Sequence, residues 1–279
     1  MKRYFLIVFI VFISGFQLVK AENWLTSFDE AKKLAVATNK LLLVDFWASW
    51  CGPCKRMDRE SWSKEDVKLL MANYVPVKID IDSQKSLAHK YGVRGIPYIF
   101  IMDGNGKVIY QQMSYKRKDQ VMDLLHKYAL NTKFLSQDLI NYFKNKNFAT
   151  TFRLAVKYQD YCLYLTKDLK RDFTHVSETY FDEALDMLKT SDLKNKEAFE
   201  QKISLYEIQE QLILENPGKA LKMLAKINDK ELDSMNQNMY GFLHYTVYKL
   251  LNDDTNASLW QDKLTKSDME KASLFLQAS

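Results

Sequence analysis

Residues 41–54 read Leu-Leu-Leu-Val-Asp-Phe-Trp-Ala-Ser-Trp-Cys-Gly-Pro-Cys. The run Leu41–Trp47 is apolar except for Asp45 and has the length of a buried strand. Cys51 follows at the point where a helix is expected to begin, because Pro53 fits a first turn that needs no N–H donor. Free N–H groups and the positive end of the helix dipole favour a thiolate there. A strand that leads into this Cys-x-x-Cys therefore predicts a chemically active thiol pair.

Two chemistries use a Cys-x-x-Cys, a zinc site and a redox couple. A closed structural zinc site needs four ligands. Cys162 is the one further cysteine, and the four histidines show no ligand spacing: His89, His126, His175 and His244. The sequence therefore favours redox chemistry and predicts neither a metal nor another cofactor. In this interpretation Cys51 attacks a partner disulfide, and Cys54 attacks the resulting mixed disulfide and releases the reduced partner.

Glycine and proline are unevenly distributed along the chain. Five Gly and three Pro lie between Asn23 and Lys133, whereas residues 134–279 contain two Gly and one Pro. The first distribution is typical of a sheet with turns and the second of stacked helices. We therefore predict two domains, at residues 22–133 and 134–279.

The first domain alternates between strand and helix patterns. The expected strands are 41–47, 75–82, 98–102 and 107–111, and the expected helices are 27–39, a short one after Cys51, 63–73, 84–91 and 118–128. Two of these helices open with capping-box patterns, Ser27 with Glu30 and Ser63 with Asp66. A hairpin turn, Asp103-Gly104-Asn105-Gly106, joins the last two strands. This order predicts a central mixed sheet with helices on both faces, an α/β fold.

The second domain has repeated helical periodicity and is predicted to be all-α. Residues 184–188, Ala-Leu-Asp-Met-Leu, resemble residues 220–224, Ala-Leu-Lys-Met-Leu, which suits a helical-hairpin repeat of the tetratricopeptide kind. An irregular helical bundle is an equal alternative. Helix starts are expected at Asn216-Pro217 and at Ser267 with Glu270. Cys162 lies among aromatic residues and is expected to be a buried apolar side chain.

The segment Leu43–Lys55 resembles the active-site segment of thioredoxins almost residue for residue. Lys78-Ile79-Asp80 and residues 91–97, Tyr-Gly-Val-Arg-Gly-Ile-Pro, resemble two later segments of that family in the same order. The resemblance covers about residues 23–130. It implies an α/β thioredoxin fold, followed in this chain by an all-α C-terminal domain.

The resemblance also implies roles for individual residues. Asp45 would be a buried carboxylate that assists removal of the Cys54 proton, with a pKa raised by burial, and Lys78 would be its partner. Pro97 would be cis and would line the substrate groove with Ile96. Trp50 would be an exposed apolar platform for a polypeptide, and the substrate-binding surface would further include Gly52 and Pro53. Trp47 is expected to pack in the core.

One position departs from the thioredoxin pattern. Arg59 stands where thioredoxins commonly have a proline that kinks the active-site helix. Residues 55–62 look more like the thioredoxin-like domains of exported bacterial disulfide reductases. The Gly-Pro dipeptide between the cysteines points to the reducing end of the family. In an oxidising compartment such a pair needs an external electron donor.

Residues 1–21 have the three parts of a signal peptide: Lys2 and Arg3, an apolar run over 4–16, and Val19-Lys20-Ala21. Cleavage is expected after Ala21, which predicts a periplasmic or secreted protein. An uncleaved anchor is the alternative, but the apolar run is shorter than the roughly 20 residues that a membrane span needs. Without this segment the chain has 37 basic and 35 acidic side chains from Lys, Arg, Asp and Glu, so no nucleic-acid partner is expected.

These features together predict an exported thiol–disulfide oxidoreductase, a protein-disulfide reductase or isomerase. Its partners would be disulfide-containing exported proteins and an electron donor such as a membrane disulfide reductase. The alternative is a redox-linked adaptor or chaperone in which the helical domain binds clients and the first domain is secondary. A homodimer through the helices, which would form an isomerase cleft, is a further possibility. The direction of the redox reaction is left open.

Overall fold

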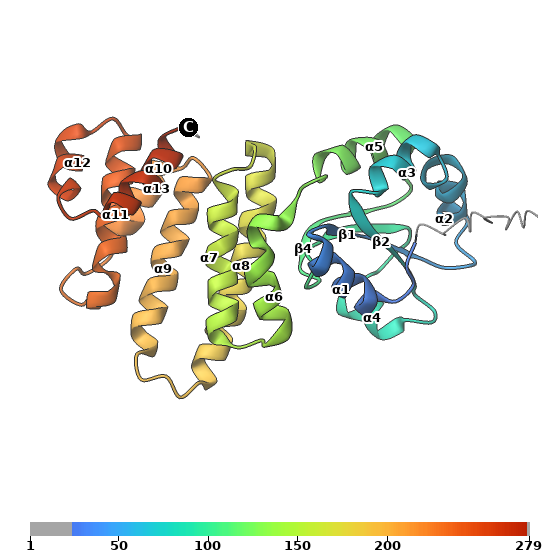
Figure 1. Cartoon of the computed structure of the whole chain (residues 1–279), viewed down its shortest axis with the longest axis horizontal. Helices are drawn as coiled ribbons and strands as arrows, with labels where there is room; N and C mark the ends of the chain where they lie inside the picture. The colour runs from blue at the N-terminus through green and yellow to red at the C-terminus, as the bar shows by residue number, and fades with distance from the viewer. Residues whose placement is uncertain (1–23, 278–279) are drawn as a thin grey trace, which may run out of the picture.

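The computed structural model describes residues 24–277, which form an α/β part followed by a helical part (Figure 1). The signal peptide predicted for residues 1–21, with its cleavage after Ala21, lies outside the described residues. Among the described residues no helix is both long and apolar enough to cross a membrane.

A four-stranded mixed sheet forms the centre of the α/β part. Its strands are β1 (Leu41–Trp47), β2 (Tyr74–Asp80), β3 (Tyr98–Met102) and β4 (Val108–Met113). Their order in the sheet is β2-β1-β3-β4, with β1 parallel to β2 and antiparallel to β3, and with β3 antiparallel to β4. Burial of all but the last residue of β1 on both faces accounts for its nearly continuous apolar sequence.

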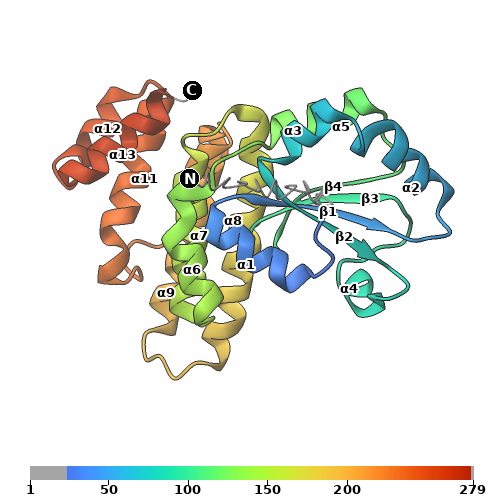
Figure 2. The same cartoon turned by 45° about the vertical axis from the view of Figure 1, so that its right-hand side comes forward.

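Helices cover both faces of this sheet, as Figure 2 shows. The helices are α1 (Phe28–Thr38), α2 (Gly52–Met57), α3 (Glu65–Met71), α4 (Lys85–Lys90) and α5 (Lys118–Lys127). Alternate residues of β1 explain the two layers. Leu42 and Val44 pack in one apolar cluster with α1 and α4, and Leu41 and Leu43 pack in the other with α2, α3 and α5. The thioredoxin-like α/β architecture predicted from the sequence is confirmed.

The helical part contains α6 to α13, also as predicted. Their bounds are α6 (Ser136–Lys144), α7 (Phe148–Cys162), α8 (Lys167–Thr190), α9 (Lys196–Ile213), α10 (Pro217–Leu224), α11 (Gln237–Leu250), α12 (Asp254–Gln261) and α13 (Lys266–Gln277). The two similar pentamers lie in α8 and α10. Each pentamer buries its alanine and its last leucine: Ala184, Leu188, Ala220 and Leu224. Equal spacing of buried residues thus explains the similarity, while a tetratricopeptide-like repeat stays a prediction.

The hairpin turn between β3 and β4 joins the two parts. Asp103 is fully buried, and its Oδ2 accepts hydrogen bonds from the hydroxyls of Tyr158, at 2.9 Å, and Tyr180, at 2.5 Å. Its Oδ1 accepts from the backbone N–H groups of Asn105 and Lys107. One apolar cluster also runs from the sheet into the helices. The apolar core thus continues across residue 133. The domain boundary predicted there stays a prediction.

Several predicted element ends were wrong. Ser63 does not cap α3: its hydroxyl donates to the carbonyl of Arg59, and Lys64 occupies the cap position without a side-chain bond. Ser267 does not begin the last helix, since Thr265 and Asp268 form the reciprocal capping pair two residues earlier. The second strand runs from 74 to 80 rather than from 75 to 82, because the Asp82 N–H turns back to the side chain of Asp80.

Candidate active site

The cysteine pair lies where β1 leads into α2. Cys51 and Cys54 form a disulfide, and both are buried, with 3% and 2% of their surface exposed. Cys51 is the N-cap residue of α2, and its Sγ accepts a hydrogen bond from the Cys54 N–H at 3.1 Å. Gly52 and Pro53 form the exposed first turn. The sulfur of Cys51 therefore faces backbone donors, which stabilise a thiolate once the disulfide is reduced.

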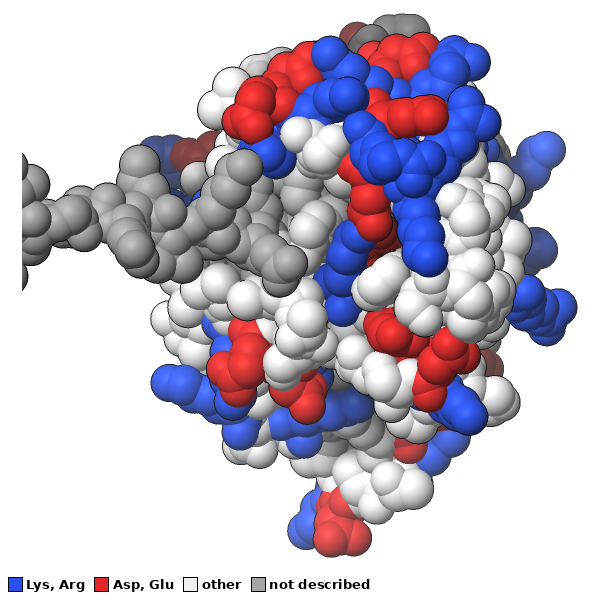
Figure 3. Space-filling model, turned by 90° about the vertical axis from the view of Figure 1, so that its right-hand side faces the viewer, with Lys and Arg blue, Asp and Glu red and all other residues white. Residues whose placement is uncertain are grey.

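Basic side chains gather on this face of the molecule, with acidic side chains among them (Figure 3). The segment after the disulfide contributes Lys55, Arg56 and Arg59, all of which are exposed. Arg56 forms an ion pair with Glu60 and lies over the Tyr115 ring.

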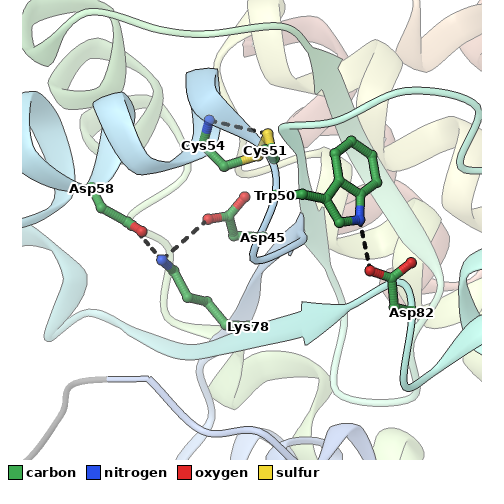
Figure 4. Close-up of a disulfide and its surroundings, with 7 residues drawn as sticks. All are labelled: Asp45, Trp50, Cys51, Cys54, Asp58, Lys78 and Asp82. Carbon is green, nitrogen blue, oxygen red and sulfur yellow. Dashed lines mark hydrogen bonds and ion pairs between the residues drawn. A yellow bond between two sulfur atoms is a disulfide. The ribbon is translucent and has the colours of Figure 1, made fainter.

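A carboxylate and an ammonium lie beneath the disulfide, as Figure 4 shows. Asp45 projects from β1 and Lys78 from the neighbouring residue of β2, because the two positions are paired in the parallel register. Asp45 Oδ2 is 3.8 Å from Lys78 Nζ. Asp45 Oδ1 is buried and has no hydrogen-bond partner within residues 24–277. The structure thus brings together the two residues that the resemblance to thioredoxins paired.

Burial raises the pKa of Asp45 from 3.8 to about 7. The positive charge of Lys78 opposes this rise, and the negative charge of Asp58 adds to it. The Trp62 indole N–H lies near the carboxylate and favours its ionised form, but completes no hydrogen bond with it. A carboxyl group that titrates near neutral pH can both accept and release a proton, which suits a proton carrier.

The loop before β3 completes the surroundings of the cysteine pair. The Ile96–Pro97 peptide bond is cis, as the resemblance implied. Ile96 packs in the small apolar cluster that contains Cys51 and Cys54. Pro97 is buried, and its carbonyl accepts a hydrogen bond from the Ser114 N–H at 2.9 Å.

Trp50 is the most prominent apolar side chain beside the pair, with 65% of its surface exposed. Its indole N–H donates to Asp82 Oδ2 at 2.7 Å, which fixes the ring next to the disulfide (Figure 4). Trp47 is partly buried and packs against the same cluster as the cysteines, as expected, while the Lys78 ammonium lies over its ring.

Sequence reasoning missed Asp58 and Asp82. Asp58 forms a close ion pair with Lys78. It opens a π-helical turn, Asp58–Trp62, that directly continues α2 and contains Arg59, the position where thioredoxins commonly have proline. The spacing of Asp58, four residues after Cys54, is a signal that could have placed it on the cysteine face of the helix.

Cys162 and the histidines take no part in this site. Cys162 is fully buried in α7, as predicted, and burial raises the pKa of its thiol. His244 is buried against the Trp260 ring. Within the part of the chain that the structure describes, no three His, Cys, Asp or Glu side chains gather as metal ligands would.

Comparison with known proteins gives the same assignment for the α/β part. A family model described as a thioredoxin-like domain matches residues 28–129. Thioredoxin of Bacillus subtilis is 33% identical over 101 residues, which are 34% of this chain and 88% of that protein. Thioredoxin-1 of Drosophila melanogaster is 39% identical over 74 residues, 26% of this chain and 67% of that protein.

Two further proteins are similar to part of this chain. Protein disulfide-isomerase of Zea mays is 35% identical over 109 residues, which are 36% of this chain and 20% of that protein. The solution structure of oxidised thioredoxin from Plasmodium falciparum aligns with 27% identity and a TM-score of 0.32, over 38% of this chain and 96% of that one. On the sequence matches, the chain belongs to the thioredoxin family and carries the thiol–disulfide oxidoreductase pair of that family at Cys51 and Cys54.

Proposed function

We propose that this chain is an exported enzyme that reduces or isomerises disulfides in other proteins. The observation that carries the proposal is the Cys51–Cys54 disulfide at the start of α2, above the buried carboxylate of Asp45 and beside the cis-Pro97 loop. Nucleophile, resolving thiol and proton carrier are thereby present in one site.

The reaction starts from the dithiol form. The Cys51 thiolate attacks one sulfur of the partner disulfide, so a bond from Cys51 to that sulfur forms, the partner's S–S bond breaks, and the partner's other sulfur leaves as a thiolate. Cys54 then attacks Cys51 and gives its thiol proton to the Asp45 carboxylate. The bond between Cys51 and the partner breaks, and the second partner sulfur leaves as a thiolate. The partner gains two electrons and the pair returns to the disulfide. In isomerisation the partner's own thiol, rather than Cys54, resolves the mixed disulfide.

The surface around the pair suits an extended polypeptide. The exposed ring of Trp50 offers an apolar contact, and Gly52 and Pro53 present a flat first turn without large side chains. Ile96 packs against the cysteines from the opposite loop, where it precedes the cis-Pro97. We assign these five residues to substrate binding and Lys78 to the support of Asp45.

Export and an electron donor complete the proposal. Export rests on the signal-peptide pattern of residues 1–21. A dithiol that reduces proteins in an oxidising compartment must itself be reduced again, so we infer a donor of the membrane disulfide reductase kind. Mass spectrometry of the mature protein tests the first point: a chain that begins at Glu22 supports cleavage, and a chain that retains Lys2 contradicts it.

Reduction of insulin by dithiothreitol, with the full-length mature chain as catalyst, tests the activity. The rate should fall to the uncatalysed level in Cys51→Ser and stay unchanged in the matched control Cys162→Ser, because Cys162 is remote from the site and fully buried. Cys54→Ala should accumulate partners in mixed disulfides. Catalysis that persists without Cys51 would refute the enzyme and favour the adaptor hypothesis. The full chain is used because the two parts share a buried interface.

A further inference from the structure

Asp58 is a second carboxylate at the site, and it binds Lys78 more closely than Asp45 does. Lys78 Nζ donates a short hydrogen bond to Asp58 Oδ1, whereas the same nitrogen lies 3.8 Å from Asp45 Oδ2. Figure 4 shows the ammonium between the two carboxylates. The cation is therefore shared unequally, in favour of the carboxylate that is not beneath the disulfide.

The backbone accounts for the position of Asp58. Asp58 lies one helical turn after Cys54, and its N–H donates to the Cys54 carbonyl, so both side chains lie on the same face. Its side chain is 35% exposed, against 14% for Lys78 and 3% for Asp45. The three groups thus form a series from the protein interior toward solvent.

Asp58 raises the pKa of Asp45, for two reasons. Its negative charge disfavours a second anion nearby, and its hold on Lys78 removes part of the cation's stabilisation of Asp45. The other groups that act on Asp45 are Lys78 from β2 and the Trp62 indole from the π-helical turn, while the cysteine pair, as a disulfide, carries no charge there. Asp58 is the one carboxylate among these groups, so it is the group whose removal would favour ionised Asp45.

We propose that Asp58 is a positioning residue, which draws the Lys78 ammonium toward itself and so leaves Asp45 able to take up and release the Cys54 proton. This inference rests on the proposed function, because it concerns the step in which Cys54 resolves the mixed disulfide. A proton carrier works best when neither of its forms is strongly favoured at the working pH. Asp58 acts through Lys78 and through its own charge, without contact with the partner protein.

The direct test is a ¹³C NMR titration of the aspartate carboxyl carbons in the oxidised full-length chain. The Asp45 signal is identified by its absence in Asp45→Asn. Asp58→Asn should lower the titration midpoint of Asp45 by about one pH unit or more, because Lys78 then pairs with Asp45 alone. Asp58→Glu should restore most of the midpoint. Asp119→Asn is the matched control, since it removes an exposed carboxylate paired with Arg117, and should leave the midpoint unchanged.

A double-variant comparison separates the two effects of Asp58. In a Lys78→Gln background, Asp58→Asn should shift the midpoint less, because the part that acts through the ammonium is gone. An Asp45 midpoint that stays or rises in Asp58→Asn would overturn the proposal, as would an equal shift in Asp119→Asn.

The pH dependence of insulin reduction is the second readout. Its lower half-maximal pH should move down in Asp58→Asn by about the shift seen by NMR, and should not move in Asp119→Asn. If Asp58→Asn is active and its pH profile does not move although the Asp45 midpoint does, the role of Asp58 in resolution of the mixed disulfide is refuted. The NMR titration needs no turnover, so a chain that reduces no disulfide would refute the proposed function while leaving the effect of Asp58 on Asp45 measurable.

Discussion

Replacement of Asp103 offers a sharp test of how the two parts of the molecule are joined. The carboxylate is fully buried and accepts four hydrogen bonds, two from backbone N–H groups of its own turn and two from Tyr158 and Tyr180 in the helical part. Asp103→Ala leaves all four buried donors without an acceptor. Asp103→Asn keeps the shape and one acceptor oxygen for the backbone, and the N–H groups of the new amide can donate to the two tyrosine hydroxyl oxygens.

The expected magnitudes follow from this difference. Each buried donor that loses its partner costs about 1–3 kcal/mol. The loss in Asp103→Ala should be smaller than the sum over the four donors, because the ionised carboxylate is itself costly to bury. Burial raises the pKa of Asp103 for the same reason. We therefore expect Asp103→Ala to lower the free energy of unfolding by about 3–5 kcal/mol, as for other broken buried charged contacts. Asp103→Asn should cost less than about 2 kcal/mol.

The distribution of tryptophans supplies the assay. Four of the five lie in the α/β part, and Trp260 alone lies in the helical part. In urea, tryptophan fluorescence therefore reports mainly the first part and far-UV circular dichroism mainly the second. The two transitions should coincide in the oxidised parent chain, which has one continuous core, and separate in Asp103→Ala. Coincident transitions in that variant, with a loss below about 1 kcal/mol, would refute the view that Asp103 joins the parts.

Three further predictions concern the site and the buried thiol. Asp45→Asn should stabilise the oxidised chain at pH 9 by up to about 4 kcal/mol, since each unit between 3.8 and about 7 is worth roughly 1.4 kcal/mol. Burial raises the pKa of Asp45 in the folded chain, so the parent loses stability as pH rises, and the difference in free energy of unfolding between parent and variant should close toward pH 4. Urea unfolding at pH 4, 7 and 9 checks this, and a difference that stays constant with pH would contradict it. Trp50→Ala should raise KM for insulin severalfold without changing the rate with a small disulfide such as oxidised glutathione, as steady-state kinetics would reveal. In the reduced chain a thiol reagent should label Cys51, the thiol at the start of α2, rapidly and should label Cys162 only in denaturant, because burial raises the pKa of the Cys162 thiol; fast labelling of Cys162 in the folded chain would argue against its burial.

Sequence patterns predicted the α/β part because short segments of the chain determine its strands, helix starts and turns. The apolar run Leu41–Trp47 could be little else than a buried strand, and Cys51 falls at the start of α2 as proposed. The Asp103–Gly106 turn joins β3 to β4 as expected. The cis bond at Pro97 was different in kind, since nothing in its neighbours required it and only the resemblance to thioredoxins implied it.

Contacts between distant segments could not be predicted in the same way. Asp103 was recognised as a turn residue, but its partners Tyr158 and Tyr180 lie 55 and 77 residues away. The π-helical turn after α2 has no established sequence signature, and it is this turn that Asp58 opens. The wrong caps at Ser63 and Ser267 show the opposite error, in which a pattern exists but is not used. The Ser63 hydroxyl donates to the Arg59 carbonyl instead, and Thr265 and Asp268 form the cap two residues before Ser267.

The two buried carboxylates of the sheet differ in a way that separates structure from chemistry. Asp45 lies near the end of β1, and Asp103 follows Met102, which pairs with Leu42 near the start of β1. Asp103 is satisfied by four donors. Asp45 has one oxygen without a hydrogen bond and a cation shared with another carboxylate. Buried polar groups in proteins are normally paired, so an incomplete set of donors calls for a reason. For Asp45 that reason is the chemistry above it. A full set of donors would hold it ionised, and the proton of Cys54 would then have no acceptor of matched strength.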